Sequence, residues 1–268
     1  MDTANKILRF PVKITDKQWA DKLQDGSVFM RSLYEYGSWS ATERAKNSDT
    51  KMKDGIQGDI REGVVQRVDP QKGDDYFNSL DPDIRKVIKE AVYIDEDRYQ
   101  YFKIYCMYGL TYILDENRFE SPNKQIRGFG NAAVIILNVD EFLSRLYKGL
   151  QRMYGNNALP RIGHVRYYQD DYSGPLNEFC KHISFAWQNE IRIRVALLDP
   201  DNYGFDKNGI KRQLLLRNRD PITVEIGDIR DISVQIPVDD LIHLKLPDQI
   251  TNLQFTMIEG DPPCPTST

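Results

Sequence analysis

The stretch "SFAWQNEIRIRVALL", residues 184–198, contains two overlapping patterns. From Ile191 onward apolar and polar residues alternate, which is typical of a β-strand with one buried face. Gln188 and Glu190 stand where this strand is expected to begin, and the alternation places both on the same face as the two arginines of the strand. That face is either a solvated surface on which Glu and Arg pair, or the polar side of a cleft in which Glu190 meets a substrate.

The composition is that of a globular chain and excludes several classes of function. The 268 residues are 40% hydrophobic and 28% charged, which is enough apolar material for a sizeable core. A formal charge of −4 without a long basic run argues against non-specific nucleic-acid binding. Neither a membrane-spanning run nor a secretory signal is expected. Three cysteines without paired spacing indicate a reducing cytoplasm, and three dispersed histidines argue against a His-based metal site.

Strands outnumber helices in the pattern of the remaining chain. Before the quoted strand, β-branched and aromatic runs predict strands at 7–14, 27–33, 101–114, 131–138 and 163–168. Helical spacing predicts helices at 15–26, 80–94 and 139–155, with Trp19 on the apolar face of the first and Asp140 capping the last. A further strand is expected at 213–217, and a hairpin or meander at 222–237. We therefore predict a single α+β domain over residues 1–258, with a long polar loop at 37–75 and a disordered tail at 259–268.

Three other positions have both a structural and a functional interpretation. Asp59 and Glu62, in "GDIREG", suit a turn or a metal pair that lacks a third ligand at a recognisable spacing. Gly130, in "RGFGNAAV", suits a tight turn or a close backbone approach to a ligand. Arg9, on the first strand, extends its charge to solvent or holds a phosphate or a ribose.

The order of these elements resembles a broad bacterial family of uncharacterised domains. The opening at 7–33 matches in its aromatic strand, helix, Gly turn and strand, and four later segments match in order: "YCMY" at 105–108, "FGNAAVIIL" at 129–137, "VRY" at 165–167 and "KHISFAWQNEIRI" at 181–193. This layout is in turn similar to the ADP-ribosyltransferase superfamily, and Gln188-x-Glu190 resembles the C3-like toxins of that superfamily at this one spot.

The resemblance implies an ADP-ribosyltransferase-like split sheet, NAD as substrate, and a role for each matching residue. Glu190 would stabilise the oxocarbenium-like transition state formed as nicotinamide leaves the ribose, and Gln188 would orient the acceptor. Arg9 would hold the pyrophosphate, and Tyr105 or Tyr108 would stack on nicotinamide. Glu190→Gln would then lower activity by roughly two to three orders of magnitude and leave the fold intact.

Three functions follow as alternatives. The first is ADP-ribosyl transfer to a protein or nucleic-acid acceptor, or NAD glycohydrolysis, by a toxin or a factor in phage–host conflict. The second is a catalytically silent binding protein, inhibitor or sensor of bacterial defence or anti-defence, acting as a homo-oligomer or with a partner protein. It is favoured because "YCMY" stands where the superfamily has Ser-Thr-Ser. The third is a metal-dependent nuclease that uses Asp59, Glu62 and a later acid.

Overall fold

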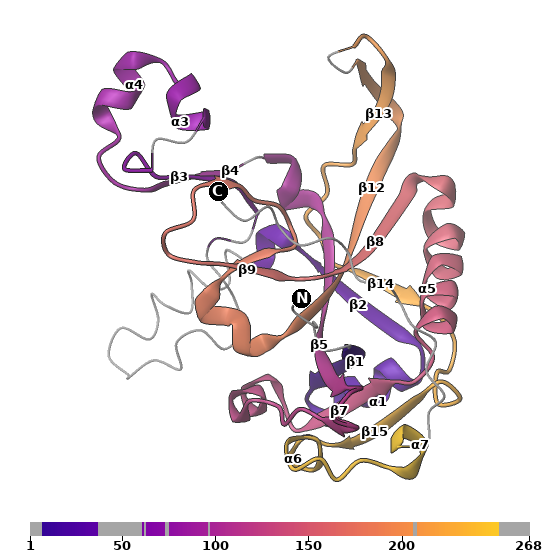
Figure 1. Cartoon of the computed structure of the whole chain (residues 1–268). Helices are drawn as coiled ribbons and strands as arrows, with labels where there is room; N and C mark the ends of the chain where they lie inside the picture. The colour runs from indigo at the N-terminus through magenta and orange to yellow at the C-terminus, as the bar shows by residue number, and fades with distance from the viewer. Residues whose placement is uncertain are drawn as a thin grey trace, which may run out of the picture.

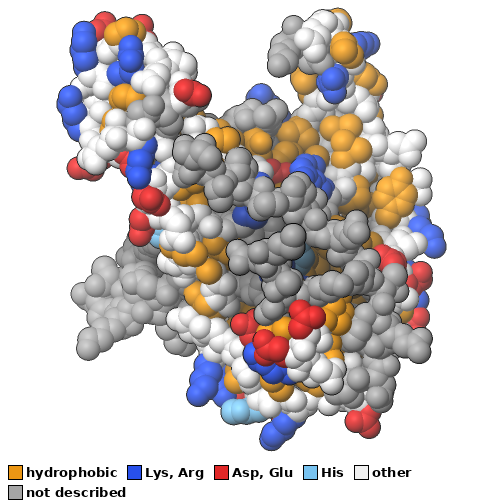
Figure 2. Space-filling view, in the orientation of Figure 1, with side chains coloured by type: hydrophobic (Ala, Val, Ile, Leu, Met, Phe, Trp, Pro, Cys, Tyr) orange, Lys and Arg blue, Asp and Glu red, His pale blue; other side chains and the backbone are white. Residues whose placement is uncertain are grey.

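A large antiparallel sheet crosses the molecule, and a small lobe and a two-stranded arm project from it (Figure 1). The fold is given by a computed structural model, which describes residues 7–36, 61, 63–72, 75–95, 97–205 and 208–251. The arm is made by the outer ends of two neighbouring strands, and Tyr203 and Phe205 on it are exposed. Figure 2 shows hydrophobic side chains over this arm. The architecture confirms the expected α+β class.

The central path of the sheet runs in the order β13-β12-β5-β1-β7-β15. These strands are β1 (Ile7–Thr15), β5 (Lys103–Ile113), β7 (Ala132–Ile136), β12 (Glu190–Phe205), β13 (Lys211–Leu215) and β15 (Ser233–Pro237). Off this path lie β2 (Ser27–Ser32), β6 (Arg118–Phe119), β8 (Ala158–His164) and β14 (Ile222–Glu225). Each pairing in this sheet is antiparallel. The first half of β12 pairs with β5 on one side and with β8 on the other, and its outer half pairs with β13 in the arm.

Helices cover the sheet on both faces, and each face has its own core. On one face α1 (Lys17–Gln24) and α5 (Val139–Tyr154) pack Leu23 and Leu146 into a core that contains Ile193 of β12. On the other face lie η2 (Lys124–Phe129), α6 (Val238–Ile242) and α7 (Asp248–Thr251), whose buried side chains join Tyr108 of β5. Because side chains alternate along β12, its start faces the second core while its isoleucines face the first.

The remaining elements form the lobe and the approach to β12. The lobe contains β3 (Val64–Val68), β4 (Val92–Asp95), β10 (Gly174–Pro175), α3 (Asp75–Ser79) and α4 (Pro82–Val87). Next come η1 (Asp97–Tyr101), which leads into β5, and η3 (Gly155–Asn157), which leads into β8. A parallel pair, β9 (Arg166–Tyr168) and β11 (Cys180–His182), precedes η4 (Ile183–Gln188), which ends directly before β12.

The predicted helix at 80–94 is wrong over its second half. The helix α4 begins as expected, with Asp81 accepting a hydrogen bond from the backbone N–H of Asp83, but it ends at Val87. Residues of β4 that had been included in the helix instead pair with β3. No side chain of α4 is buried, so nothing in the tertiary structure extends the helix against the strand pairing.

The two other predicted helices are confirmed, but two details within them are corrected. Trp19 does not join the apolar face of α1, because its side chain is 51% exposed and lies beneath the ammonium of Lys22. The cap of α5 is Asn138, whose side-chain oxygen accepts from the backbone N–H of Glu141 at 3.0 Å, and Asp140 is the second residue of the helix, in its first turn. Asn is as good an N-cap as Asp, so local sequence does not decide between them.

Residues 222–237 do not form the predicted hairpin or meander. β14 pairs with β2, whereas β15 pairs with β7, so the two strands join different parts of the sheet. Between them Gly227 has a positive φ of 80°, and the isoleucines on either side are buried in the core under α5. Burial of this connection outweighs the short-range pairing that a Gly turn favours.

The predicted polar loop at 37–75 lies partly outside the described residues, and the predicted tail at 259–268 lies wholly outside them. Asp59 and Glu62 of that loop also lie outside them. Within the predicted polar loop at 37–75, the described part contains β3 and the start of α3. Among the described residues, no helix combines the length and the apolar character that crossing a bilayer requires.

Candidate functional site

A sharp turn at Asn189 sets where β12 begins. Asn189 adopts a left-handed conformation, with φ 38° and ψ 55°, and ends the 3-10 helix η4. Asn tolerates this region because its short polar side chain can hydrogen-bond locally. Here its amide nitrogen donates to the Thr111 hydroxyl at 3.0 Å and to the Gly109 carbonyl, while its own carbonyl accepts from the Gly109 N–H at 2.7 Å. The turn is thereby fixed onto β5, and Glu190 becomes the first residue of the strand.

Glu190 is buried between two cations. Its Oε1 accepts from Arg192 Nε at 2.8 Å, and its Oε2 lies 2.7 Å from Lys181 Nζ. The side chains of Glu190 and Lys181 are only 5% and 6% exposed, and that of Arg192 is 1% exposed. Lys181 Nζ also donates to Gln188 Oε1 at 3.0 Å, so one ammonium joins the amide and the carboxylate. We call these four residues the Glu190 cluster.

The backbone explains why these four side chains meet. Glu190 and Arg192 are two residues apart on one strand and therefore share a face. Lys181 lies on β11, which runs parallel to β9, and η4 folds the chain back so that this lysine reaches the start of β12. Tyr167, the register partner of Lys181, accepts the backbone N–H of Glu190 on its hydroxyl at 2.9 Å.

The electrostatics keep Glu190 ionised. Burial by itself raises the pKa of a carboxyl, but the charges of Arg192 and Lys181 and the hydrogen bond from Arg192 outweigh it and hold the pKa of Glu190 well below its ordinary value. Burial and the nearby carboxylate raise the pKa of Tyr167 to about 12. At neutral pH Glu190 is therefore a fixed carboxylate that has no proton to give.

The charges continue along β12 as an alternating row. Arg192 also donates to the backbone carbonyl of Glu178, and Arg194 Nε donates to the Glu178 carboxylate at 2.8 Å. Arg194 lies over the ring of Phe102, 4.6 Å from guanidinium carbon to ring centroid. Glu and Arg do pair on this face, as the first of its two interpretations expects, but the face is not solvated at the start of β12, because Glu190 and Arg192 are buried there.

Of the predicted site residues, three lie together. Gln188 and Glu190 belong to the Glu190 cluster, and Tyr108 is the register partner of Glu190 on β5, on the same face of the sheet. Gln188 reaches the cluster from η4 and not from the strand, which corrects the expected strand start. Burial raises the pKa of Tyr108 to about 12, so its hydroxyl stays protonated at neutral pH.

The other predicted residues lie elsewhere. Arg9 pairs with Thr111 of β5, so the alternation of side chains places it on the opposite face of the sheet from Glu190. Tyr105 also faces that opposite side, where it is buried in the core with the ammonium of Lys13 4.5 Å from its ring centroid. The sheet itself therefore separates both side chains from the Glu190 carboxylate.

Gly130 takes part in a close backbone contact between two elements. Its φ is 148°, and a Cβ at this position would lie 2.1 Å from the carbonyl carbon of Thr15. Only glycine allows this approach, which brings the end of η2 against the end of β1. The neighbouring Phe129 stacks on Trp187 of η4, with ring centroids 5.6 Å apart, so this turn touches the approach to β12 through an aromatic pair.

The sequence did not reveal the roles of two members of the Glu190 cluster, Lys181 and Arg192, or that of their neighbour Tyr167. In the sequence, Lys181 and Tyr167 stand out only as members of the resembling motifs, and Arg192 only as a polar residue of the strand. The available signal was the order Lys, Gln, Glu, Arg within a dozen residues, in which both cations flank the acid. That order does not show that η4 brings the lysine back to the carboxylate.

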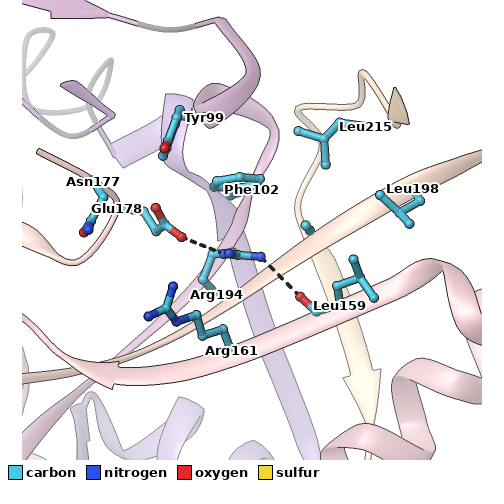
Figure 3. Close-up of a pocket in the computed structure, with 10 residues that line it drawn as sticks. Tyr99, Phe102, Leu159, Arg161, Asn177, Glu178, Arg194, Leu198 and Leu215 are labelled. Atoms are coloured by element: carbon cyan, nitrogen blue, oxygen red, sulfur yellow. Dashed lines mark hydrogen bonds and ion pairs between the residues drawn. The ribbon is translucent and has the colours of Figure 1, made fainter. Parts of the chain in front are cut away.

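A pocket of about 400 Å³ opens on the same face of β12, where the arm begins (Figure 3). Arg161 of β8 and Arg194 of β12 lie next to each other in it, and Glu178 faces them. Leu198 and Leu215, the first residue pair of the arm, form its apolar wall. The row of charges that begins at Glu190 therefore ends in an open cavity.

The described residues contain no group of three or more His, Cys, Asp or Glu side chains that could hold a metal ion. No family model, curated protein or solved structure matches the chain. The Glu190 cluster and the pocket are therefore the features of the described chain that bear on its function.

Proposed function

We propose that this chain is a catalytically silent binding protein, in which the Glu190 cluster organises the binding face and carries out no reaction. The observation that carries the proposal is that both carboxylate oxygens of Glu190 already have cationic partners inside the protein. A carboxylate that acts on a substrate needs at least one oxygen directed at it, and a path by which the substrate arrives. Glu190 is 5% exposed.

The sign of the local charge supports the same proposal. Cleavage of a glycosidic bond to nicotinamide develops positive charge on the ribose, which a net negative site stabilises. The Glu190 cluster contains one carboxylate and two cations, Lys181 and Arg192, at hydrogen-bonding distance. Its net charge is positive, and at short range in a low-dielectric interior this opposes a developing cation.

A second candidate is NAD-dependent ADP-ribosyl transfer or NAD glycohydrolysis on an ADP-ribosyltransferase-like fold. It is favoured by the neighbourhood of β12, β5 and β1, the strands to which the resemblance assigns the site. In register, Glu190 stands next to Tyr108, and Tyr108 next to Val12, so the three strands meet at the start of β12. Catalysis would require Lys181 to leave Glu190, which would free one oxygen and remove one positive charge.

The two candidates separate in an assay for nicotinamide release. The purified protein is incubated with labelled NAD, with and without a cell lysate, and release of nicotinamide and transfer of label are measured. We expect neither for the wild type. Lys181→Met, which frees one carboxylate oxygen of Glu190, is expected to remain inactive too.

NAD turnover by the wild type that disappears in Glu190→Gln would overturn the binding proposal and support the enzyme. Because Glu190→Gln also weakens the fold, its circular dichroism is recorded under the assay conditions to show that it is folded. Glu116→Gln serves as the matched control, because Glu116 also pairs with the arginine two residues later, but on the surface.

A further inference from the structure

The pocket at the base of the arm contains more positive than negative charge. Two guanidinium groups, of Arg161 and Arg194, face the single carboxylate of Glu178. Arg194 is already engaged, because its Nε donates to Glu178 at 2.8 Å and its Nη1 donates to the backbone carbonyl of Leu159 at 3.5 Å (Figure 3). The second arginine therefore leaves the pocket with one positive charge in excess.

Arg161 is the arginine that remains open to a ligand. Its guanidinium carbon lies 5.4 Å from the ring centroid of Phe179, and within the described part of the chain it forms no ion pair with a carboxylate. A guanidinium presents a planar fork of donors that matches a phosphate or a carboxylate. Figure 3 shows it beside Arg194 in the pocket, so that one anionic group can lie near both guanidinium groups.

The rest of the pocket is mainly apolar and aromatic. Leu159, Leu198 and Leu215 lie on one side, and Tyr99 and Phe102 lie on the other (Figure 3). Tyr99 and Phe102 are packed edge to face, with ring centroids 5.2 Å apart, which fixes the aromatic side. A volume of about 400 Å³ is at the small end of the range for ligand pockets. These walls suit a flat apolar body that carries one anionic group.

We propose that this pocket binds a small phosphate ester with an aromatic body, of the size of a mononucleotide. Arg161 provides the main contact to the phosphate, and Arg194, which is held in place by Glu178 and the Leu159 carbonyl, adds its positive charge beside it. The leucines and Tyr99 contact the aromatic body, and Glu178 accepts a hydrogen bond from a ligand hydroxyl. The inference rests on the proposed binding function, because it names the class of ligand that this function takes.

The test is isothermal titration of the full chain with four probes. AMP and 3′,5′-cyclic AMP carry a phosphate on an aromatic nucleoside, as a dianion and a monoanion respectively. Adenosine lacks the phosphate, and inorganic phosphate lacks the aromatic body. We expect at least one of the two nucleotides to bind at least about tenfold more tightly than adenosine and inorganic phosphate, because the charged contact and the apolar walls act together.

Arg161→Gln is the decisive variant because it removes the spare charge without breaking an ion pair to a described residue. It is expected to weaken nucleotide binding at least about tenfold. Arg31→Gln is the matched control, since Arg31 also lies over an aromatic ring, that of Phe29, at 5.5 Å, but outside the pocket. It should leave the affinity unchanged.

The proposal is overturned if neither nucleotide binds, if adenosine or inorganic phosphate binds as tightly as the nucleotides, or if Arg161→Gln and Arg31→Gln behave alike. These outcomes are independent of the NAD assay. If the protein hydrolyses NAD and also binds a nucleotide through Arg161, the silent function is refuted and the ligand proposed for the pocket is supported. If it neither hydrolyses NAD nor binds a nucleotide, only the ligand proposed for the pocket is refuted.

Discussion

Replacing Glu190 by Gln tests the central feature of the structure, the buried carboxylate between two cations. The change keeps the shape of the side chain and removes its charge. Lys181 and Arg192 then lie buried next to a neutral amide, whereas in the wild type each is within 2.8 Å of a carboxylate oxygen. Removing one partner of a buried ion pair typically costs about 3 to 5 kcal/mol, because the other charge stays uncompensated. We expect Glu190→Gln to lower the free energy of unfolding by an amount in this range.

This expectation corrects the one drawn from sequence, which was that Glu190→Gln leaves the fold intact. Native domains are stable by only about 5 to 15 kcal/mol, so the substitution removes a large part of the total. The assay is equilibrium unfolding in urea at neutral pH, followed by circular dichroism. Glu116→Gln is measured beside it. The pair formed by Glu116 and Arg118 has the same spacing, but its side chains are 43% and 55% exposed, so a change of at most about 1 kcal/mol is expected.

The pH dependence gives a second readout of the same pair. The pKa of Glu190 is lowered in the folded state, so its contribution is fully present above the ordinary carboxyl pKa of 4.5 and is lost as pH falls toward the lower folded value. The wild type should therefore lose stability relative to Glu190→Gln below about pH 4.5, at up to about 1.4 kcal/mol per pH unit. The reasoning is refuted if Glu190→Gln costs no more than Glu116→Gln, or if the gap between wild type and variant does not narrow in acid.

Two further substitutions test how other buried features hold the sheet. Lys103→Met removes a fully buried ammonium that donates to the Asn218 and Asp220 carbonyls at 2.6 and 2.7 Å; we expect a loss of about 1 to 3 kcal/mol and faster amide exchange at 216–221, and unchanged exchange there would contradict this. Gly149→Ala places a Cβ 2.6 Å from Val224 Cγ1, so it should destabilise by about 1 to 3 kcal/mol although alanine favours helices; a more stable variant in thermal unfolding would show that α5 can move away from β14.

Local pattern was sufficient to predict most elements of the fold. The alternation in β12, the helical spacing of α5 and the apolar run of β7 each reflect an environment that is uniform over the whole element. The failures have a different cause. β14 and β15 were expected to pair with each other, and the end of the 80–94 helix to stay helical, because a sequence shows neighbours along the chain and not competing partners from elsewhere.

The candidate site divides in the same way. Sequence alone singled out Gln188 and Glu190, and its alternation correctly placed Glu190 and Arg192 on one face. The alternation of β1 already placed Arg9 on the opposite face of that strand from Phe10 and Val12. Only the register between β1 and β5 shows that this is also the face opposite to Glu190. Lys181 could not be assigned, because its contact depends on the fold of η4.

The sequence by itself determined that Glu190 stands near the start of a strand, two residues after Gln188 and two residues before Arg192. Those are one-dimensional facts, and the period of a strand turns them into a shared face. Only the tertiary structure decided what that acid meets. The left-handed turn at Asn189 and the parallel pair of β9 and β11 bring Lys181 to within 2.7 Å of it. A charge whose partners are brought by other segments can be located in a sequence, but whether it is free to act is decided by the packing around it.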